Sequence, residues 1–396
     1  MELYLQMGYG MQQLSKNLLK LWNGGNIIIS PVNIKQTQLT KFTKEIKSLN
    51  GKILFDPQIF YPHDANSNLK EYDYWPAGTI SETSTLSAIN AELLKLNNQI
   101  ETDSIILPSS IMSESSFKSC YDQLSTTAKF FRSKTPKNLY ATLCVASETV
   151  RNHLFIENII DDLTNLDVDG FYVIAQPSNG EYINSDHLWT IGLLKLVSCL
   201  KLRKFSVIIG YSSHQTLVAS LAKVDGIASG TYMNTRSFEP SKFQSHRDDD
   251  TKRKSTWYYL PEAFNEYKAT ILDVAKQRGF LQTFAPQGNF YNQYSSMLFS
   301  GAQPSSTNYN ETNSFLHYLY CLKQQCEMLT KNSYDDTFNT YEFLLNNADN
   351  KIKELKRKGI RGQNRDFEPG IETNRIAMYA LNEDYGFKLK LDWSTL

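Results

Sequence analysis

The segment from residue 170 to residue 213 indicates the fold most clearly. It begins with the apolar run GFYVIAQPS at 170–178, continues with a helical spacing of apolar residues over His187–Leu200, and ends with a second apolar run, FSVIIGYSS, at 205–213. Runs that are apolar at nearly every position are typical of parallel strands whose two faces are both covered. The segment therefore predicts a strand, a helix and a second strand parallel to the first.

The same alternation of short apolar runs, turns and helical spacings extends over the first 235 residues. Eight parallel strands close into a barrel, so we expect a (β/α)8 barrel over residues 1–240, followed by a charged loop and a mainly helical region over 241–396. The expected strands are Leu3–Met7, Asn26–Ile29, Lys52–Phe55, Ser104–Leu107, Leu139–Val145, Gly170–Ala175, Phe205–Ile209 and Gly226–Ser229. The expected helices are Gln12–Trp22, Gln36–Leu49, Thr83–Asn98, Ser116–Phe131, Val150–Leu166, His187–Leu200 and Gln215–Ala222.

The pattern changes after Arg236. The stretch Ser245–Ser255, SHRDDDTKRKS, carries mixed charge and no apolar face, which indicates a solvent-exposed loop. The last thirty residues are expected to add a short strand at Phe387–Trp393 or to pack on the barrel. Further helices are expected at Pro261–Gln277, Thr312–Lys331 and Tyr341–Lys358.

The composition excludes several classes of protein. The 41 Lys and Arg residues balance 41 Asp and Glu residues, so net charge indicates no partner, and a hydrophobic content of 41% excludes a disordered chain. The N-terminus does not resemble a signal peptide, and no apolar run is long enough to span a membrane. The five cysteines are scattered, without the spacing of a zinc site, so we expect a reduced, cytoplasmic protein without metal or cofactor.

Asp56 is the expected catalytic residue. It directly follows an apolar strand and precedes Pro57, and reactive residues of parallel barrels lie at the carboxyl ends of the strands. A carboxylate held there in a partly dry cavity can have its pKa tuned for acid or base catalysis. Two alternatives remain: an Asp before Pro can simply begin a turn, or Asp56 could bind a metal together with His63 and Asp64.

Other residues at the ends of expected strands are candidates for substrate binding. Gly210 and Gly230 follow the seventh and eighth strands, where a barrel can bind a phosphate or a flavin, although glycines also permit tight exits from strands. The complete set is Ser109, Cys144, Glu148, Gln176, Gly210, Tyr211, Ser229, Gly230 and Asn234.

A basic stretch near the C-terminus could bind nucleic acid by neutralising phosphates. Its charges could instead complement the C-terminal dipole of a helix, and Arg236 could pair locally with Glu239. The candidate nucleic-acid contacts are Arg236, Lys356, Arg357, Lys358 and Arg361.

Several strings of residues together resemble the tRNA-guanine transglycosylase superfamily, including its branch that inserts 7-deazaguanine into DNA. ILFDPQIF at 53–60 looks like the family segment ILTDSGGFQ, and the string at 159–181 is similar to the stretch ending DGYAIGGLAVGE. The string at 208–236 is similar to the one ending GVDMFDCVLPTR. The resemblance implies a barrel that exchanges guanine for a 7-deazaguanine, with Asp56 as acid and base, and with Cys144 and Gln176 lining the base pocket.

The sequence also departs from this family. The interval 226–234 contains no carboxylate where the family has its nucleophilic aspartate, Asp225 lies at the start of its strand, and the zinc-binding set is absent. Three readings therefore stay open. The protein is a transglycosylase-like enzyme acting on a nucleobase in DNA or RNA, or an inactive barrel that binds nucleic acid or a partner protein in an assembly, or a flavin or sugar-phosphate enzyme.

Overall fold

The computed structural model describes residues 1–244 and 255–396, so nearly all of the loop expected at 245–255 lies outside the described residues. All eight barrel strands occur where the sequence predicts them, within one residue at each end. They are β1 (Glu2–Gln6), β2 (Gly25–Ile29), β3 (Gly51–Phe55), β4 (Ser104–Leu107), β5 (Asn138–Val145), β6 (Gly170–Ala175), β7 (Ser206–Ile209) and β8 (Gly226–Ser229).

The eight strands form one parallel sheet in the order β3-β2-β1-β8-β7-β6-β5-β4. β1 pairs with both β2 and β8, as Tyr4 with Asn26 and Leu3 with Ile227 show, so the sheet curves back on itself into a nearly closed (β/α)8 barrel. The seam lies between β3 and β4, which are neighbours without a ladder of their own. The expected fold class is therefore confirmed.

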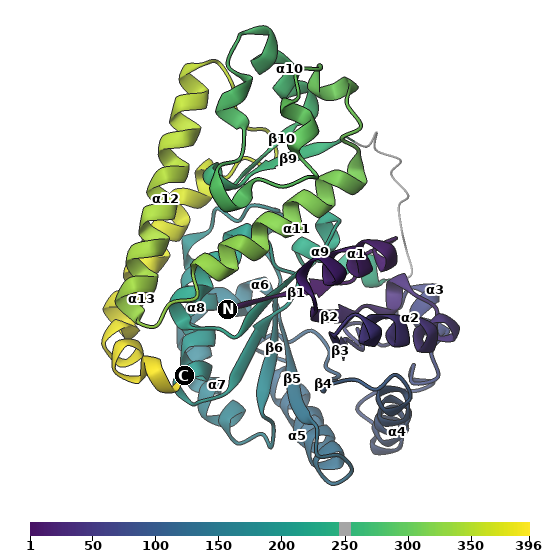
Figure 1. Ribbon diagram of the computed structural model, residues 1–396. Helices are drawn as coiled ribbons and strands as arrows, with labels where there is room; N and C mark the ends of the chain where they lie inside the picture. Colours follow the sequence, from purple (N-terminus) through teal and green to yellow (C-terminus); the bar gives the residue numbers. More distant parts are fainter. Residues whose placement is uncertain (245–254) are drawn as a thin grey trace.

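Helices surround this sheet and extend beyond it (Figure 1). Those that precede, join or follow the barrel strands are α1 (Gln12–Trp22), α2 (Gln36–Ser48), α3 (Ser67–Lys70), α4 (Thr83–Gln99), α5 (Phe117–Arg132), α6 (Ser147–Arg151), α7 (His153–Thr164), α8 (His187–Leu202) and α9 (Met233–Arg236). After β8 come a hairpin, β9 (Trp257–Leu260) and β10 (Asn265–Lys268), and then α10 (Ala269–Gln277), α11 (Glu311–Met328), α12 (Tyr334–Arg357) and α13 (Glu368–Asp392). Among the described residues, no helix is long and apolar enough to cross a bilayer.

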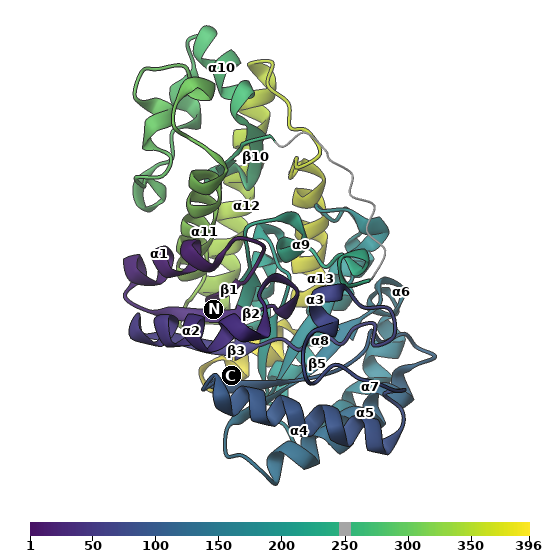
Figure 2. The ribbon, with the colours of Figure 1, turned by 90° about the vertical axis from the view of Figure 1, so that its right-hand side faces the viewer.

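The C-terminal elements pack on the barrel and complete its outer layer. α11 contacts β1 and α1, so the helix covering this part of the sheet comes from beyond the hairpin. α13 packs against both α12 and α8. Figures 1 and 2 show the hairpin and α10 at one end of the molecule, with α12 extending from there along the barrel.

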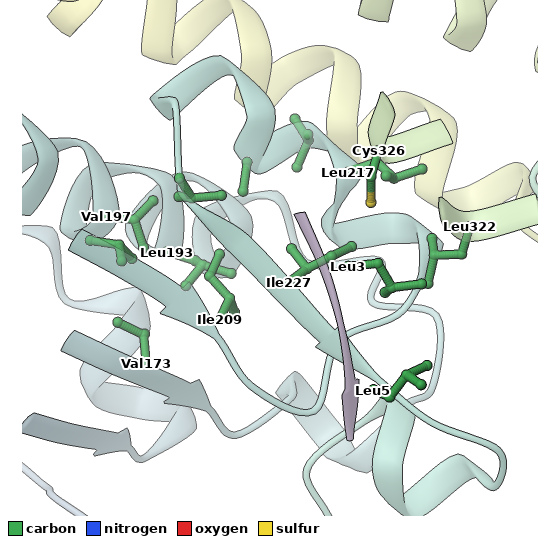
Figure 3. Packing of buried hydrophobic residues seen from close by; sticks show 14 of the residues in the cluster. Leu3, Leu5, Val173, Leu193, Val197, Ile209, Leu217, Ile227, Leu322 and Cys326 are labelled. Carbon is green, nitrogen blue, oxygen red and sulfur yellow. The ribbon is translucent and has the colours of Figure 1, made fainter. Parts of the chain in front are cut away.

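The core has two layers because side chains alternate along each strand. Residues such as Leu3, Val173 and Ile227 face outward and pack against residues of α8 and α11, including Val197 and Leu322 (Figure 3). Their neighbours in the chain face inward and fill the barrel with a smaller second cluster. That inner cluster includes Ile28, Leu54, Ile106, Tyr140, Cys144, Tyr172, Ile208 and Ala228.

An aspartate directly before β4, β6 and β8 clasps each of these strands to the strand that precedes it in the chain. The aspartate backbone N–H donates to a carbonyl of that strand at 2.8–2.9 Å, and its carboxylate accepts the N–H of the same residue at 2.6–2.8 Å. A cation from an earlier helix binds the carboxylate at 2.8 Å. In order of aspartate, strand residue and cation, the clasps are Asp103 with Ile53 and Lys47, Asp169 with Leu139 and Arg132, and Asp225 with Val207 and Lys201.

Two of these clasps, those of Asp103 and Asp225, bear on the seam of the barrel and on the search for a nucleophile. Asp103 bridges the seam between β3 and β4 at the amino ends of the strands. Asp225 lies at that same end, as the sequence indicates, and its carboxylate is occupied by Lys201 and the backbone of Val207. It therefore cannot serve as a nucleophile at the opposite end of the barrel, where Asp56 lies.

We expect Asp169→Ala to lower the free energy of unfolding by about 1–3 kcal/mol, because it leaves the N–H of Leu139 without its acceptor. Asp167→Ala is the matched control, since Asp167 binds the same Arg132 at 3.1 Å and its carboxylate accepts no backbone N–H from the described part of the chain. An exposed ion pair contributes about 0–1 kcal/mol. Urea unfolding measures the change in the free energy of unfolding for each variant. Equal changes for Asp169→Ala and Asp167→Ala would show that the clasp does not stabilise the barrel.

Two expected helices and one of the two alternatives for the C-terminus differ from the structure. The expected helix Pro261–Gln277 is helical only from Ala269, because the aromatic run at Trp257–Leu260 pairs with Asn265–Lys268 in an antiparallel hairpin. For Phe387–Trp393 the strand alternative is wrong and the packing alternative is confirmed: α13 continues to Asp392 and packs against α8, and Leu389 and Trp393 are buried. The expected helix Val150–Leu166 is two helices, since Asn152 separates them and caps the second.

Candidate functional site

Asp56 lies at the carboxyl end of β3 and points into the barrel. Its backbone N–H donates to the carbonyl of Ile29 at 3.0 Å, which continues the pairing of β3 with β2 and fixes the direction of the side chain. The side chain is completely buried. Asp56 is therefore an interior residue of the barrel mouth, which we define as the space at the carboxyl ends of the eight strands.

Three groups hold the carboxyl of Asp56. The hydroxyl of Tyr211 donates to Oδ2 at 2.8 Å, and the backbone N–H of Gln58 donates to Oδ1 at 3.1 Å. The hydroxyl of Tyr172 lies 3.4 Å from Oδ2. The amide of Gln58 also donates to the hydroxyl oxygen of Tyr211 at 2.8 Å, so Gln58 orients the tyrosine that binds Asp56.

A second set of polar groups continues this network across the barrel to β1 and β2. The hydroxyl of Tyr172 donates to Oε1 of Gln6 at 2.8 Å, and the amide nitrogen of Gln6 donates to Ser30 at 2.9 Å. Because a phenol has a single hydrogen and the shorter contact is to Gln6, the hydroxyl oxygen of Tyr172 can accept a hydrogen bond from the protonated carboxyl of Asp56. The network therefore accommodates Asp56 in its neutral form.

Burial raises the pKa of Asp56 to about 7, although the hydrogen bonds from Tyr211 and Gln58 lower it in part. A carboxyl group with a pKa near 7 can release or accept a proton under neutral conditions. Such a shifted carboxyl inside a barrel mouth is typical of catalytic acids and bases.

Two of the residues that hold Asp56 have strained backbones. Gln58 has a φ of 55° and Tyr211 has a φ of 50°, both in the left-handed region that residues other than glycine rarely adopt. Strain of this kind costs about 1–3 kcal/mol per residue and concentrates at functional sites. Its presence on both sides of one carboxyl is independent support for a functional role of this site.

Gly210 and Gly230 allow close packing at the mouth. A Cβ at Gly210 would lie 2.5 Å from the ring and hydroxyl of Tyr172, and a Cβ at Gly230 would lie 2.3 Å from the carbonyl of Gln6. Their absent side chains therefore make room for the Asp56 network. This close packing is a third role, beyond the two that the sequence left open, and a phosphate or flavin site at these glycines stays a prediction.

Three phenylalanines cover the Asp56 network, and we call them the aromatic cap: Phe60, Phe238 and Phe243. Phe60 meets the other two edge to face, with ring centroids 5.1 Å and 4.9 Å apart, and all three side chains are nearly fully buried. Phe238 also contacts the ring of Tyr211 at 5.5 Å. All three rings thus pack on Tyr211, which binds the completely buried Asp56.

The structure gathers some of the predicted site residues and disperses others. Tyr211 binds Asp56 directly, and the buried Cys144 belongs to the same interior cluster as the cap and Tyr172. Ser109 and Ser229 are buried, whereas Gln176 and Asn234 are partly exposed. Glu148 is on α6 with a side chain 86% exposed, so it does not face the network.

Gln6, Gln58 and Tyr172 are functional candidates that the sequence analysis missed. Gln6 is the polar residue at the end of the run ELYLQ, and Gln58 belongs to the short segment that follows Asp56. Tyr172 is inside the run GFYVIA, where its hydroxyl is the single polar side-chain group. A polar atom on an inward-facing position of an apolar strand is the signal that identifies Gln6 and Tyr172.

A second buried polar cluster lies where the barrel meets the hairpin. Arg236 is 2% exposed, its Nε donates to the carbonyl of Gly230 at 3.0 Å, and its ion pair is with Glu266 at 3.1 Å. Arg365 binds the same carboxylate at 2.7 Å, and Tyr182 donates to it at 2.8 Å. Arg236 therefore pairs with Glu266 instead of Glu239, and its burial keeps it from contacting a nucleic acid at the surface.

Acidic neighbours neutralise part of the basic stretch at the end of α12. Lys356 pairs with Glu368, and Lys358 pairs with Glu354 at 2.7 Å. Arg357 and Arg361 are exposed. Binding of nucleic acid to this stretch stays a prediction.

The structure does not bring together the metal ligands that the sequence left as an alternative. His63 is exposed, whereas Asp56 is buried within its network of tyrosines and amides. Within residues 1–244 and 255–396, no group of three His, Cys, Asp or Glu side chains is arranged to hold a metal ion. All five cysteines are buried and free, and Cys321 and Cys326 are core residues of α11.

The sequence matches no family model and no curated protein. Solved structures with a similar fold include a thermostable xylanase mutant from Cellvibrio japonicus, at 9% identity over 58% of this chain and 85% of the other, with a TM-score of 0.35. Thiamine phosphate pyrophosphorylase from Pyrococcus furiosus is 12% identical over 58% and 85%, with a TM-score of 0.31. The L-Ala-D/L-Glu epimerase from Bacillus subtilis is 10% identical over 65% and 58%, with a TM-score of 0.32. Similarities at this level do not extend to function.

Proposed function

We propose that this barrel acts on the N-glycosidic bond of a nucleobase in a nucleic acid, with Asp56 as the acid that protonates the departing base. The observation that carries the proposal is the buried carboxyl of Asp56, which has a pKa raised to about 7 and lies at the carboxyl end of a barrel strand. The resemblance of residues 53–60 to the transglycosylase segment supports the choice of substrate.

The chemistry assigned to Asp56 is a single proton transfer. When the bond between C1′ and the base nitrogen breaks, its electron pair stays on the base, and the proton of Asp56 neutralises the charge that develops there. Tyr211 and Gln58 then stabilise the carboxylate that remains, because both already donate to it. The sugar carbon is then captured by an incoming base or by water, and the proton that this nucleophile loses returns to the carboxylate of Asp56. A base must leave the duplex before a group at the mouth of a barrel can reach it.

A second candidate function is binding without catalysis, and the aromatic cap favours it. Phe60, Phe238 and Phe243 cover Asp56, and no carboxylate is among the groups that directly contact it in the described part of the chain. In this alternative the barrel would bind a nucleic acid or a partner protein. Asp56 would then serve only to fix the interior of the mouth.

We expect Asp56→Asn to reduce base release or base exchange by about 10²–10⁴-fold, because an amide cannot supply the proton. The assay follows labelled guanine in single-stranded and duplex DNA and RNA. Since the acid form is required, activity of the unchanged protein should decline as the pH rises through 7. Asp73→Asn, on the loop that follows β3, is the control and should retain activity.

The same variant separates the two candidate functions. Under the catalytic proposal, Asp56→Asn loses turnover and keeps its affinity for nucleic acid. Activity equal to that of the unchanged protein excludes Asp56 as the acid. Salt-dependent binding without turnover in either protein supports the binding alternative, because phosphate contacts weaken as salt concentration rises.

A further inference from the structure

Phe243 is enclosed by aromatic rings in the way that a planar ligand would be. Its ring stacks on Phe238 with an interplanar angle of 25° and a centroid distance of 5.4 Å. Phe60 and Tyr211 meet it edge to face, at centroid distances of 4.9 Å and 5.9 Å. Aromatic rings in these arrangements attract any planar π system, a nucleobase included.

This ring-sized space adjoins the polar network of Asp56. Tyr211 forms one wall of the space with its ring and donates to Asp56 with its hydroxyl at 2.8 Å. A heterocycle in the place of Phe243 would therefore have the ring of Phe238 on its face and the ring of Tyr211 at its edge, and Tyr211 connects it to the carboxyl of Asp56. The phenylalanine ring makes the aromatic contacts but has no polar group that could bond to the Asp56 network.

Within residues 1–244 and 255–396, the segment that carries Phe243 has few hydrogen bonds to the rest of the chain. Phe243 ends the single turn η4 (Pro240–Phe243), in which Ser241 and Lys242 are exposed. The recorded backbone link from Phe243 to the opposite side of the mouth is its carbonyl, which accepts the N–H of Asn66 at 3.0 Å. Segments held by few contacts open at low free energy while the barrel stays folded.

We propose that Phe243 is a removable plug, and that the space it fills binds a planar heterocycle carrying hydrogen-bonding groups on one edge. The inference rests on the proposed function for the class of ligand, and it adds that the closed mouth is a self-occupied form of the base site. The ligand enters when η4 moves outward and Phe243 leaves the rings of Phe238, Phe60 and Tyr211.

The chemical reactivity of the Cys144 thiol can show whether Phe243 leaves its site, and this measurement does not require catalysis. Its thiol is buried in the same cluster as Phe60 and Phe243, whereas Cys321 is buried on α11 in the other cluster. Reaction with N-ethylmaleimide, followed by mass spectrometry, gives the labelling rate of each thiol. We expect Phe243→Ala to raise the rate at Cys144 by about tenfold or more, and to leave the rate at Cys321 unchanged.

Two further variants make the result interpretable. Phe131→Ala removes a fully buried ring from α5, away from the mouth, and should not increase labelling of Cys144 relative to Cys321. Phe243→Leu keeps most of the apolar volume of the side chain. If Phe243→Ala does not fold, the labelling rate of Cys144 is measured in Phe243→Leu instead. A parallel rise at both thiols would indicate global unfolding and would overturn the proposal, as would no rise at Cys144.

Ligand protection then tests the class of ligand. Guanosine monophosphate should slow labelling of Cys144 in Phe243→Ala, and ribose 5-phosphate, which lacks the ring, should not. Equal protection by both compounds, or by neither, contradicts a heterocycle site. Because labelling does not depend on turnover, it can succeed when base release fails, so failure of this inference and failure of the proposed function remain distinguishable.

Discussion

Glu266→Ala is expected to lower the free energy of unfolding by about 3–5 kcal/mol, because it leaves buried guanidinium groups without their carboxylate. Burial alone would raise the pKa of Glu266, but Arg365 and Arg236 hold it at about 2. Both ion pairs are short, and Arg236 is 2% exposed. Without Glu266, water would have to reach the charged guanidinium groups of Arg236 and Arg365, and this would disrupt the packing around them.

The location of Glu266 explains why the effect should extend beyond one ion pair. Glu266 is on β10, Arg236 ends α9 at the barrel mouth, and Arg365 precedes α13. The guanidinium of Arg236 also lies 3.4 Å from the ring centroid of Tyr318 on α11. One carboxylate thus joins the barrel to the hairpin and to the C-terminal helices.

Urea unfolding at pH 7 measures this effect against a matched surface pair. Glu327→Ala removes the partner of Lys323, a partly exposed pair at 2.8 Å on α11, and should change the free energy of unfolding by about 0.5 kcal/mol or less. Glu266→Gln retains the shape of the side chain and should show the cost of the missing charge. If Glu266→Ala costs no more than Glu327→Ala, the buried cluster does not stabilise the junction.

The barrel strands could be predicted from the sequence because each has a pattern that is confined to a few neighbouring residues. An apolar run such as SVII or FYVIA, followed by a turn residue, needs no knowledge of its partner to be recognised as a parallel strand. The carboxyl end of such a run then indicates the mouth, which is how Asp56 was found. Alternation along β6 would also have placed Tyr172 inside the barrel.

The remaining features depend on pairs of residues far apart in the chain. The partner of Arg236 is 30 residues away, and the second cation on Glu266 is 99 residues away, so neither pairing has a local signal. The alternating run FKLKLDW reads locally as a strand, but it lies in α13, which packs against α8 and α12. The aromatic cap also unites two loops that the chain separates.

The stability of the protein should depend on pH through Asp56, and Asp56→Asn should remove that dependence. In the folded protein the pKa of Asp56 is raised to about 7 by burial, whereas an unfolded aspartate has a pKa of about 3.9. Between these values the folded state binds more protons than the unfolded state. The contribution of Asp56 is therefore complete below pH 4 and is lost as the pH rises to 7, at about 1.4 kcal/mol for each pH unit.

The difference between the two proteins isolates this contribution. Glu262 and Asp366 also have raised pKa values because of burial, but they are present in both proteins and cancel. The free energy of unfolding of Asp56→Asn, minus that of the unchanged protein, should increase by about 4 kcal/mol between pH 4 and pH 7 and then level off. Tyr211→Phe should extend the loss above pH 7, because it removes a hydrogen bond that favours the carboxylate. A difference that stays constant with pH would show that Asp56 is ionised throughout, and it could not then act as the acid.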